Sequence, residues 1–159
     1  AMNISMKKSL LGMVGAIALT GFGVAQAAPV VYAGTTALTT GGGLMANCTL
    51  TLTGDIDSSG VVTVTGAGAT GASPCDLIKN GTYPWTGDTS TSSISTGAYS
   101  SVIYAGTVLD TCGGNVTGVV YNYTAGDPLP TSVDINTAGA SGNYGGACTI
   151  SGSLTRVLP

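Results

Sequence analysis

Serine and threonine, which could act as nucleophiles, are plentiful in this sequence of 159 residues, but side chains that could act as general bases are scarce. The chain contains no histidine, so neither a Ser-His-Asp triad nor a Cys-His pair can form. A serine–lysine pair would have to use Lys79, and no SxxK motif surrounds that lysine. Asp55 and Asp57 are the closest pair of carboxylates, but they fall in an expected turn, where aspartate is common. We therefore expect no catalytic residues and no enzymatic activity.

The same turn resembles the opening of a calcium-binding loop. Residues 55–60 read D-I-D-S-S-G, which places oxygen-bearing side chains at Asp55, Asp57 and Ser59 and a glycine at the sixth position. The twelfth position is Gly66 and not the glutamate that would bind calcium with both oxygens. A plain hairpin turn is the interpretation we favour, with a calcium site as the alternative. No cofactor is expected.

The four cysteines predict disulfide bonds and not a metal site. They are Cys48, Cys75, Cys112 and Cys148; none belongs to a CxxC pair, and no histidine is available to complete a zinc site. Three pairings are possible. We favour Cys48–Cys75 with Cys112–Cys148, because each half of the chain then carries one bridge across a loop of comparable length. Each closure would stabilise the fold by about 3 kcal/mol on the chain-entropy model.

The N-terminus has the pattern of a cleaved signal peptide. A basic pair at residues 7–8 precedes an uncharged, mostly apolar run over residues 9–24. Ala25-Gln26-Ala27 then places small residues at minus three and minus one from an expected cut after Ala27. The apolar run is shorter than the roughly 20 residues that span a bilayer, and no second run follows. We expect residues 1–27 to be removed and the mature chain to have no transmembrane segment.

Translation is expected to start at Met2 or Met6, so that residues 1–5 include an artefact of the gene assignment or of cloning. The expected location of the mature protein is outside the cell, secreted or on the cell surface. After cleavage, two basic residues, Lys79 and Arg156, face seven aspartates, a formal net charge of about −5. Two cations cannot form the dense positive face that nucleic acid or an anionic membrane surface requires. Nucleic acid is therefore excluded as a partner.

The elements that must carry these residues are β-strands. A mature chain of about 130 residues suits one domain, and its Gly, Thr and Val content favours strands joined by tight turns. Apolar and hydroxylated side chains alternate over residues 48–53 and 62–65, which predicts a hairpin with its turn over residues 55–60. Further strands are expected at residues 101–109, 115–123, 132–135 and 149–157, and turns at residues 111–114, 126–128 and 139–146. The predicted fold is all-β: a single antiparallel β-sandwich or small barrel with two disulfides.

The segment 28–45 differs from the disulfide-bonded β domain expected over 46–159. It begins with the apolar residues Val30, Val31 and Tyr32 and ends near three consecutive glycines. An edge strand or flexible lead-in is the interpretation we favour. The alternative is a donor strand that completes the sheet of a neighbouring subunit, with the glycines as a hinge.

Aromatic residues are tyrosines for the most part, and they allow two interpretations. Packing in the core or across strands is the one we favour. The alternative is an exposed aromatic patch that touches apolar or polymeric material. The residues concerned are Tyr32, Tyr83, Tyr99, Tyr104, Tyr121, Tyr123, Tyr144 and the single tryptophan, Trp85.

Taken together, several short motifs resemble the protein activator of alkane oxidation family of PraA/PraB-like secreted proteins. The order of the cysteines and the Pro84-Trp85 pair after the second cysteine are the most specific elements. The resemblance covers most of the mature chain from about residue 35. The motifs lie at residues 48–54, 62–67, 73–77, 83–86, 111–116 and 148–154.

The resemblance implies a secreted factor linked to growth on long-chain alkanes, and to adhesion and biofilm matrix in related proteins. It brings no catalytic residues. We therefore expect a noncatalytic cell-surface or biofilm-matrix protein that promotes adhesion to, or use of, hydrophobic substrates such as alkanes. The alternative is a structural subunit of an extracellular fibre that polymerises by β-strand donation. The expected partners are further copies of the chain, and hydrophobic material or matrix polymers.

Overall fold

The fold is one antiparallel β-sheet that curls around a single core. The computed structural model describes residues 29–158, except 92, 137–141 and 146. No α-helix occurs in that part of the chain; a short 3-10 turn, η1 (Cys75–Leu77), is the one helical element there. The strands are β1 Val30–Thr39, β2 Met45–Ile56, β3 Val61–Thr70, β4 Ile78–Asn80, β5 Trp85–Asp88, β6 Ser93–Tyr104, β7 Thr107–Thr117, β8 Val119–Asn122, β9 Ser132–Ile135 and β10 Thr149–Leu158.

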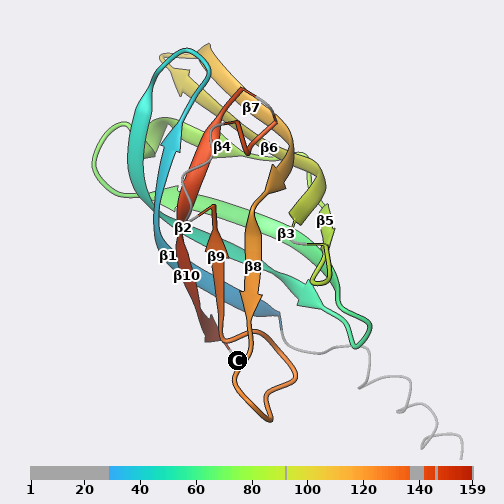
Figure 1. Cartoon of the computed structure of the whole chain (residues 1–159). Coiled ribbons are helices and arrows are strands. Elements are labelled where there is room, and N and C mark those ends of the chain that lie inside the picture. Colours follow the sequence, from blue (N-terminus) through green and yellow to red (C-terminus); the bar gives the residue numbers. More distant parts are fainter. Residues whose placement is uncertain (1–28, 92, 137–141, 146, 159) are drawn as a thin grey trace, which may run out of the picture.

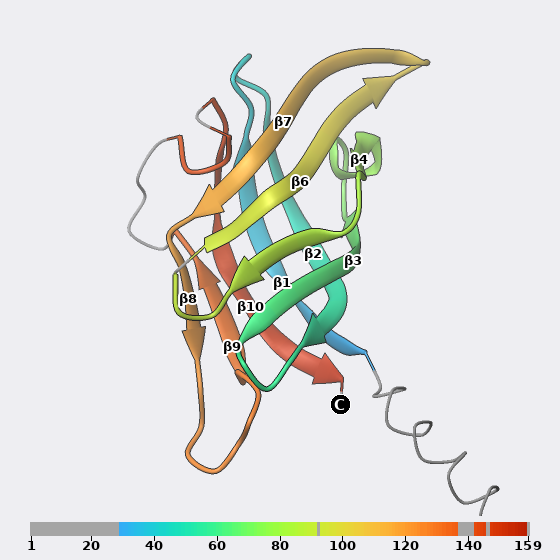
Figure 2. The ribbon, with the colours of Figure 1, turned by 90° about the vertical axis from the view of Figure 1, so that its right-hand side faces the viewer.

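The strands follow the order β8-β9-β10-β1-β2-β3-β5-β6 across the sheet, and every pairing is antiparallel. β4 and β5 pair with different halves of the long strand β6, and β7 pairs along its other edge. β1, β2, β10, β9 and β8 run side by side (Figure 1). Seen from the side, β3, β6 and β7 cross in front of β1, β2 and β10 at an angle (Figure 2). The two halves of one sheet thus form the two layers of a sandwich, as the predicted fold class requires.

Alternating burial along the strands places one face of the sheet in the core. On β2, Ala46, Cys48, Leu50 and Leu52 are buried while the residues between them are more exposed. Leu154 and Val119 are completely buried, and Ile135 is nearly so. The period of two in the sequence therefore predicted the inner face correctly.

Glycine in the strands permits the close backbone approaches of a strongly curled sheet. A Cβ atom at Gly34 would lie 2.0 Å from the carbonyl oxygen of Ser153, and one at Gly54 would lie 2.0 Å from that of Thr63. Neither position can therefore carry a side chain without moving the neighbouring strand. Part of the high glycine content thus belongs to the sheet itself and not to turns.

Three predicted elements differ from the observed ones. Residues 101–109 were expected as one strand, but a two-residue turn at Ala105 and Gly106 divides them between β6 and β7. Residues 111–114, expected as a turn, lie inside β7, because pairing with β6 keeps them extended. The strand expected at 115–123 is broken at Gly118, whose φ is 73°. The hairpin of β2 and β3, and strands β9 and β10, agree with the prediction.

The N-terminal segment is part of the sheet. β1 pairs with β2 on one side and with β10 on the other. β1 is therefore an interior strand of the same sheet, and not the edge strand or flexible lead-in that we favoured for residues 28–45. Donation of β1 to another subunit stays a prediction. The predicted signal peptide, residues 1–27, lies outside the described residues. In the part that the structure describes, no helix has both the length and the hydrophobicity to cross a membrane.

Both disulfides have the favoured pairing. Cys48–Cys75 ties β2 to η1, and Cys112–Cys148 ties β7 to the residue before β10. The second bridge lies at the seam of the curled sheet, where Thr117 donates its N–H to the carbonyl of Asn143 at 2.8 Å. From this seam the chain passes through Gly118 directly from β7 into β8, which is at the opposite edge of the sheet.

Candidate apolar contact surface on the β6–β7 hairpin

The hairpin of β6 and β7 projects beyond the neighbouring strands (Figure 2). Its turn has φ of 51° at Ala105 and 81° at Gly106. Positive φ at both central residues matches the twist of a two-residue hairpin loop, so the strands stay paired up to Tyr104 and Thr107. The tip is therefore a continuation of the sheet and not a loose loop.

Large apolar side chains cover this end of the hairpin. Tyr104 is 61% exposed, and Val108 and Leu109 are each 54% exposed. The β6–β7 register shifts between Val102 and Ile103, so Leu109 is an extra residue in β7, and a bulge of this kind re-aims side chains. We call Tyr104, Val108 and Leu109 the hairpin tip.

The hairpin tip is electrically neutral. No charged residue occurs between Asp88 and Asp110. The Asp110 carboxylate turns toward the β1–β2 turn, where it accepts a hydrogen bond of 2.8 Å from the N–H of Gly42. Hydrogen bonds from the Thr40 hydroxyl and from Gly42 hold the pKa of Asp110 below its ordinary value. Asp110, the charged residue nearest to the tip in the sequence, thus points its carboxylate toward the β1–β2 turn and away from the tip.

Two apolar cavities lie inside the curled sheet, and both are too small for an alkane chain. One lies between Tyr32, Ile56 and Tyr121, and the other is lined by Trp85 and Tyr144; each has a volume of about 30 Å³. This volume is the space open to the centre of a water molecule, and about 10–15 Å³ of it is needed for one water, so each cavity has room for about two or three waters. Neither cavity can therefore enclose a long alkane chain in this structure, and the exposed surface is the part of the described chain that we consider for such contact.

The structure assigns the calcium-like residues to a hairpin turn. The Asp57 carboxylate accepts hydrogen bonds from the Ser59 N–H at 2.8 Å, the Ser59 hydroxyl at 2.7 Å and the Val61 N–H at 3.0 Å. These hydrogen bonds lower the pKa of Asp57, and the bond from the Ser59 hydroxyl has the largest effect. Asp55 lies in β2 opposite Thr63. In the described residues, no group of three or more His, Cys, Asp or Glu side chains is placed to hold a metal ion. The turn geometry thus favours the hairpin interpretation.

The residues that we predicted to mediate assembly lie at the start of β1 and pack within this molecule. Val30 and Tyr32 are buried, and Val31 is half-buried opposite Thr53. The Tyr32 hydroxyl donates a hydrogen bond of 2.7 Å to the carbonyl of Pro130, and burial raises the pKa of Tyr32. In this chain their contacts are made within the molecule.

The tyrosines divide between packing and exposure. Tyr144 is buried and shares a hydrogen bond of 2.9 Å with Ser100, and burial raises its pKa to about 12. Tyr83 is partly exposed and stacks on the buried Trp85, with ring centroids 5.2 Å apart. Tyr104 and Tyr123 are exposed. Packing therefore accounts for Tyr144 and Trp85, and contact of the exposed tyrosines with apolar or polymeric material stays a prediction.

The sequence reasoning missed Val108 and Leu109, because the whole segment 101–109 was expected as one strand with a buried face. Ala105-Gly106 between two apolar runs was the available signal of a turn, and it is weaker than the usual Asn-Gly or Asp-Gly.

The family comparison agrees with the motifs of the disulfide-bonded sheet. The model of the PraA/PraB-like alkane oxidation protein activators matches residues 3–158. The chain belongs to this family. The matched region begins at residue 3 and not near residue 35, so it includes most of the predicted signal peptide. Comparison with curated proteins and with solved structures gave no match.

Proposed function

We propose that this PraA/PraB-like protein acts outside the cell as a noncatalytic surface or matrix protein that brings cells into contact with hydrophobic substrates such as alkanes. The observation that carries the proposal is the hairpin tip, an exposed and uncharged group of large apolar side chains on a projecting hairpin. Exposed apolar patches mark interaction sites in soluble proteins. Family membership supports the link to alkanes, and two disulfides are typical of an oxidising compartment.

The energy available to such a contact is modest for one molecule. About half of each tip side chain is exposed, and full burial of a side chain of this size is worth about 1.5–3 kcal/mol. Covering all three at an oil surface would therefore contribute about 3 kcal/mol, a factor of roughly one hundred in the partition constant. Many copies on one cell would multiply the effect through avidity.

The test replaces the three residues of the hairpin tip by threonine, which preserves the β-propensity of the strands. The matched control carries threonine at Val61, Val120 and Val157, which are 40%, 49% and 54% exposed at other places on the sheet. The measurement is the fraction of purified protein bound to hexadecane droplets, with growth on hexadecane as a second readout.

We expect the tip variant to lose roughly a hundredfold in droplet binding, following the burial energy above, and the control variant to lose far less. Equal losses in both variants would show that contact is spread over the whole surface. Unchanged binding in the tip variant would refute the proposal for this hairpin.

A further inference from the structure

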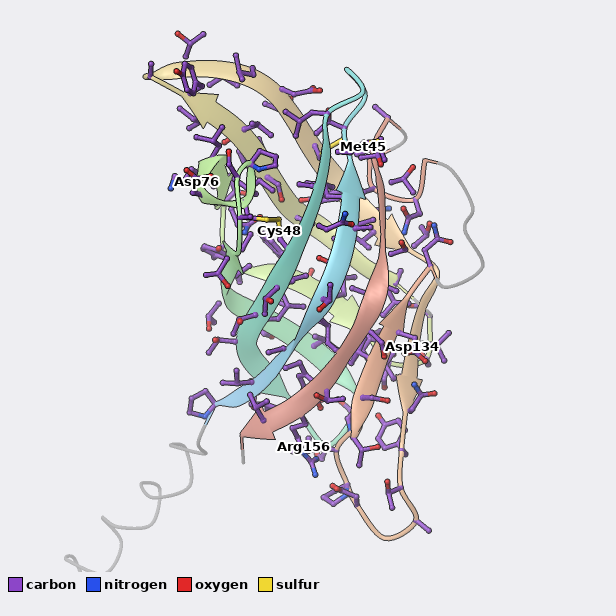
Figure 3. The ribbon with its side chains drawn as sticks, turned by 90° about the vertical axis from the view of Figure 1, so that its left-hand side faces the viewer. Met45, Cys48, Asp76, Asp134 and Arg156 are labelled. Atoms are coloured by element: carbon purple, nitrogen blue, oxygen red, sulfur yellow. A yellow bond between two sulfur atoms is a disulfide. The ribbon has the colours of Figure 1, made fainter. Side chains whose placement is uncertain are left out.

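β1 fills a slot between the two strands that lie near the beginning and the end of the described chain. Figure 3 shows it between β2 and β10. It pairs with β2 from Val30 to Thr39 and with β10 from Val31 to Thr39. Four of its side chains are buried: Val30, Tyr32, Thr36 and Leu38. Without β1, two long strand edges and the core beneath them would be open, and such edges pair readily with another strand.

No disulfide holds β1 in place. The bridges join residues 48 to 75 and 112 to 148, so both lie C-terminal to the β1–β2 turn. β1 can therefore leave its slot as an N-terminal arm while the rest of the sheet remains cross-linked. Its covalent connection to β2 is the turn itself.

The turn is short and contains three glycines. Thr40 and Leu44 are joined by a backbone hydrogen bond of 2.9 Å, and Gly43 donates to the Thr40 carbonyl at 2.9 Å. If these bonds open, the five residues 40–44 extend to about 17 Å, at roughly 3.3–3.6 Å per residue. Adjacent strands are about 4.8 Å apart, so the opened turn spans more than three strand spacings, which lets β1 move clear of its own sheet.

The slot accepts a specific sequence. Gly34 has no room for a side chain next to Ser153, and a Cβ atom at Gly152 would lie 2.3 Å from the carbonyl oxygen of Thr35. Gly152 belongs to β10 and so to the wall of the slot. A second copy of this chain carries the strand that has glycine at position 34 and the four buried side chains. The occupant that fits best is therefore β1 of another copy.

We infer that β1 exchanges between copies of this protein, so that the β1 of one molecule completes the sheet of the next. Reciprocal exchange closes a dimer, and one-directional exchange gives an open filament. The Asp110 carboxylate, bonded to Gly42, holds the turn in its closed form and opposes exchange.

Disulfide trapping with the full mature chain tests this inference. Ala33 lies opposite Thr51 in the β1–β2 register, and paired residues are close enough for a disulfide. One chain carries Ala33→Cys and the other Thr51→Cys. The two chains are mixed in denaturant with native disulfides intact, refolded together at high protein concentration, and oxidised. The matched control replaces Ala33→Cys by Ala37→Cys, whose partner is Asn47, four residues away from Thr51.

We expect a disulfide-linked dimer on a non-reducing gel from the in-register mixture and its loss in the off-register control. A single chain with both Ala33→Cys and Thr51→Cys should form the bond internally when oxidised as a dilute monomer, and then give no dimer when concentrated. Asp110→Asn should increase the dimer yield, whereas Asp76→Asn, with the same change of charge, should not. The inference is wrong if the in-register mixture gives no more dimer than the control while the double-cysteine chain forms its internal bond. The gel contains no oil, so this result is independent of droplet binding.

Discussion

Removal of the Cys112–Cys148 bridge is the perturbation whose cost follows most directly from the structure. The bridge joins positions 36 residues apart and lies at the seam of the curled sheet. The chain-entropy relation gives about 3.8 kcal/mol for closing a loop of this length. We expect Cys112→Ala with Cys148→Ala to lower the free energy of unfolding by about this amount.

The assay is urea unfolding, followed by the fluorescence of Trp85, which is buried and is the single tryptophan of the chain. The matched control is Cys48→Ala with Cys75→Ala, which opens a loop of 27 residues. The same relation gives about 3.6 kcal/mol for that loop, so the two variants should lose nearly equal stability.

Hydrogen exchange distinguishes the two variants, because the bridges lie in different places. The amides of Thr117 and Gly145 donate to the carbonyls of Asn143 and Asn115 across the seam. They should exchange faster in Cys112→Ala/Cys148→Ala and at the native rate in the other variant. A loss of less than about 1 kcal/mol in the seam variant would refute the loop-closure reasoning, since native disulfides in small secreted domains usually contribute 2–5 kcal/mol. Equal protection of both amides in the two variants would refute the assignment of the seam.

Three further results are expected. Leu154→Ala should cost about 2–5 kcal/mol in urea unfolding because Leu154 is completely buried, whereas Val157→Ala at an exposed position of the same strand should stay within about 0.5 kcal/mol. Gly34→Val should prevent normal packing of β1, because its Cβ would meet the carbonyl oxygen of Ser153 at 2.0 Å; a native urea midpoint would contradict this. The hydrogen bond from Arg156 lowers the pKa of Asp127 from its ordinary 3.8, so the stabilisation is present above that value and is lost as the pH falls through the lower folded pKa. Asp127→Asn should therefore flatten the acid side of the stability curve measured between pH 7 and pH 2, and an unchanged curve would exclude this pair as its cause.

Sequence patterns predicted the parts of the fold that depend on local alternation. The β2–β3 hairpin, β9 and β10 follow from apolar and polar side chains that change face at each residue. The cysteine pairing could be chosen by loop length, and the structure has that pairing.

Long-range pairing determined what the sequence could not reveal. Residues 111–114 have the composition of a turn, yet β6 keeps them extended. The glycine-rich segment 41–43 suggested a separate lead-in, whereas β1 is central because β10, more than a hundred residues later, pairs with it. The hairpin tip was missed for a related reason, since its turn residues carry a weak local signal and only the register of β6 with β7 reveals the bulge at Leu109.

The place of β1 also determines when the sheet can be completed. Thr155 donates its hydroxyl to the carbonyl of Ala33, and the two residues are 122 positions apart in the chain. Closing a loop of that length costs an entropy of about 4 kcal/mol, which no local contact repays in advance. β1, the first of the described strands to be synthesised, therefore keeps one open edge until β10 has been made. Such non-local topologies fold in milliseconds to seconds and not in microseconds. A growing chain also presents an unfinished sheet until β10 has been made.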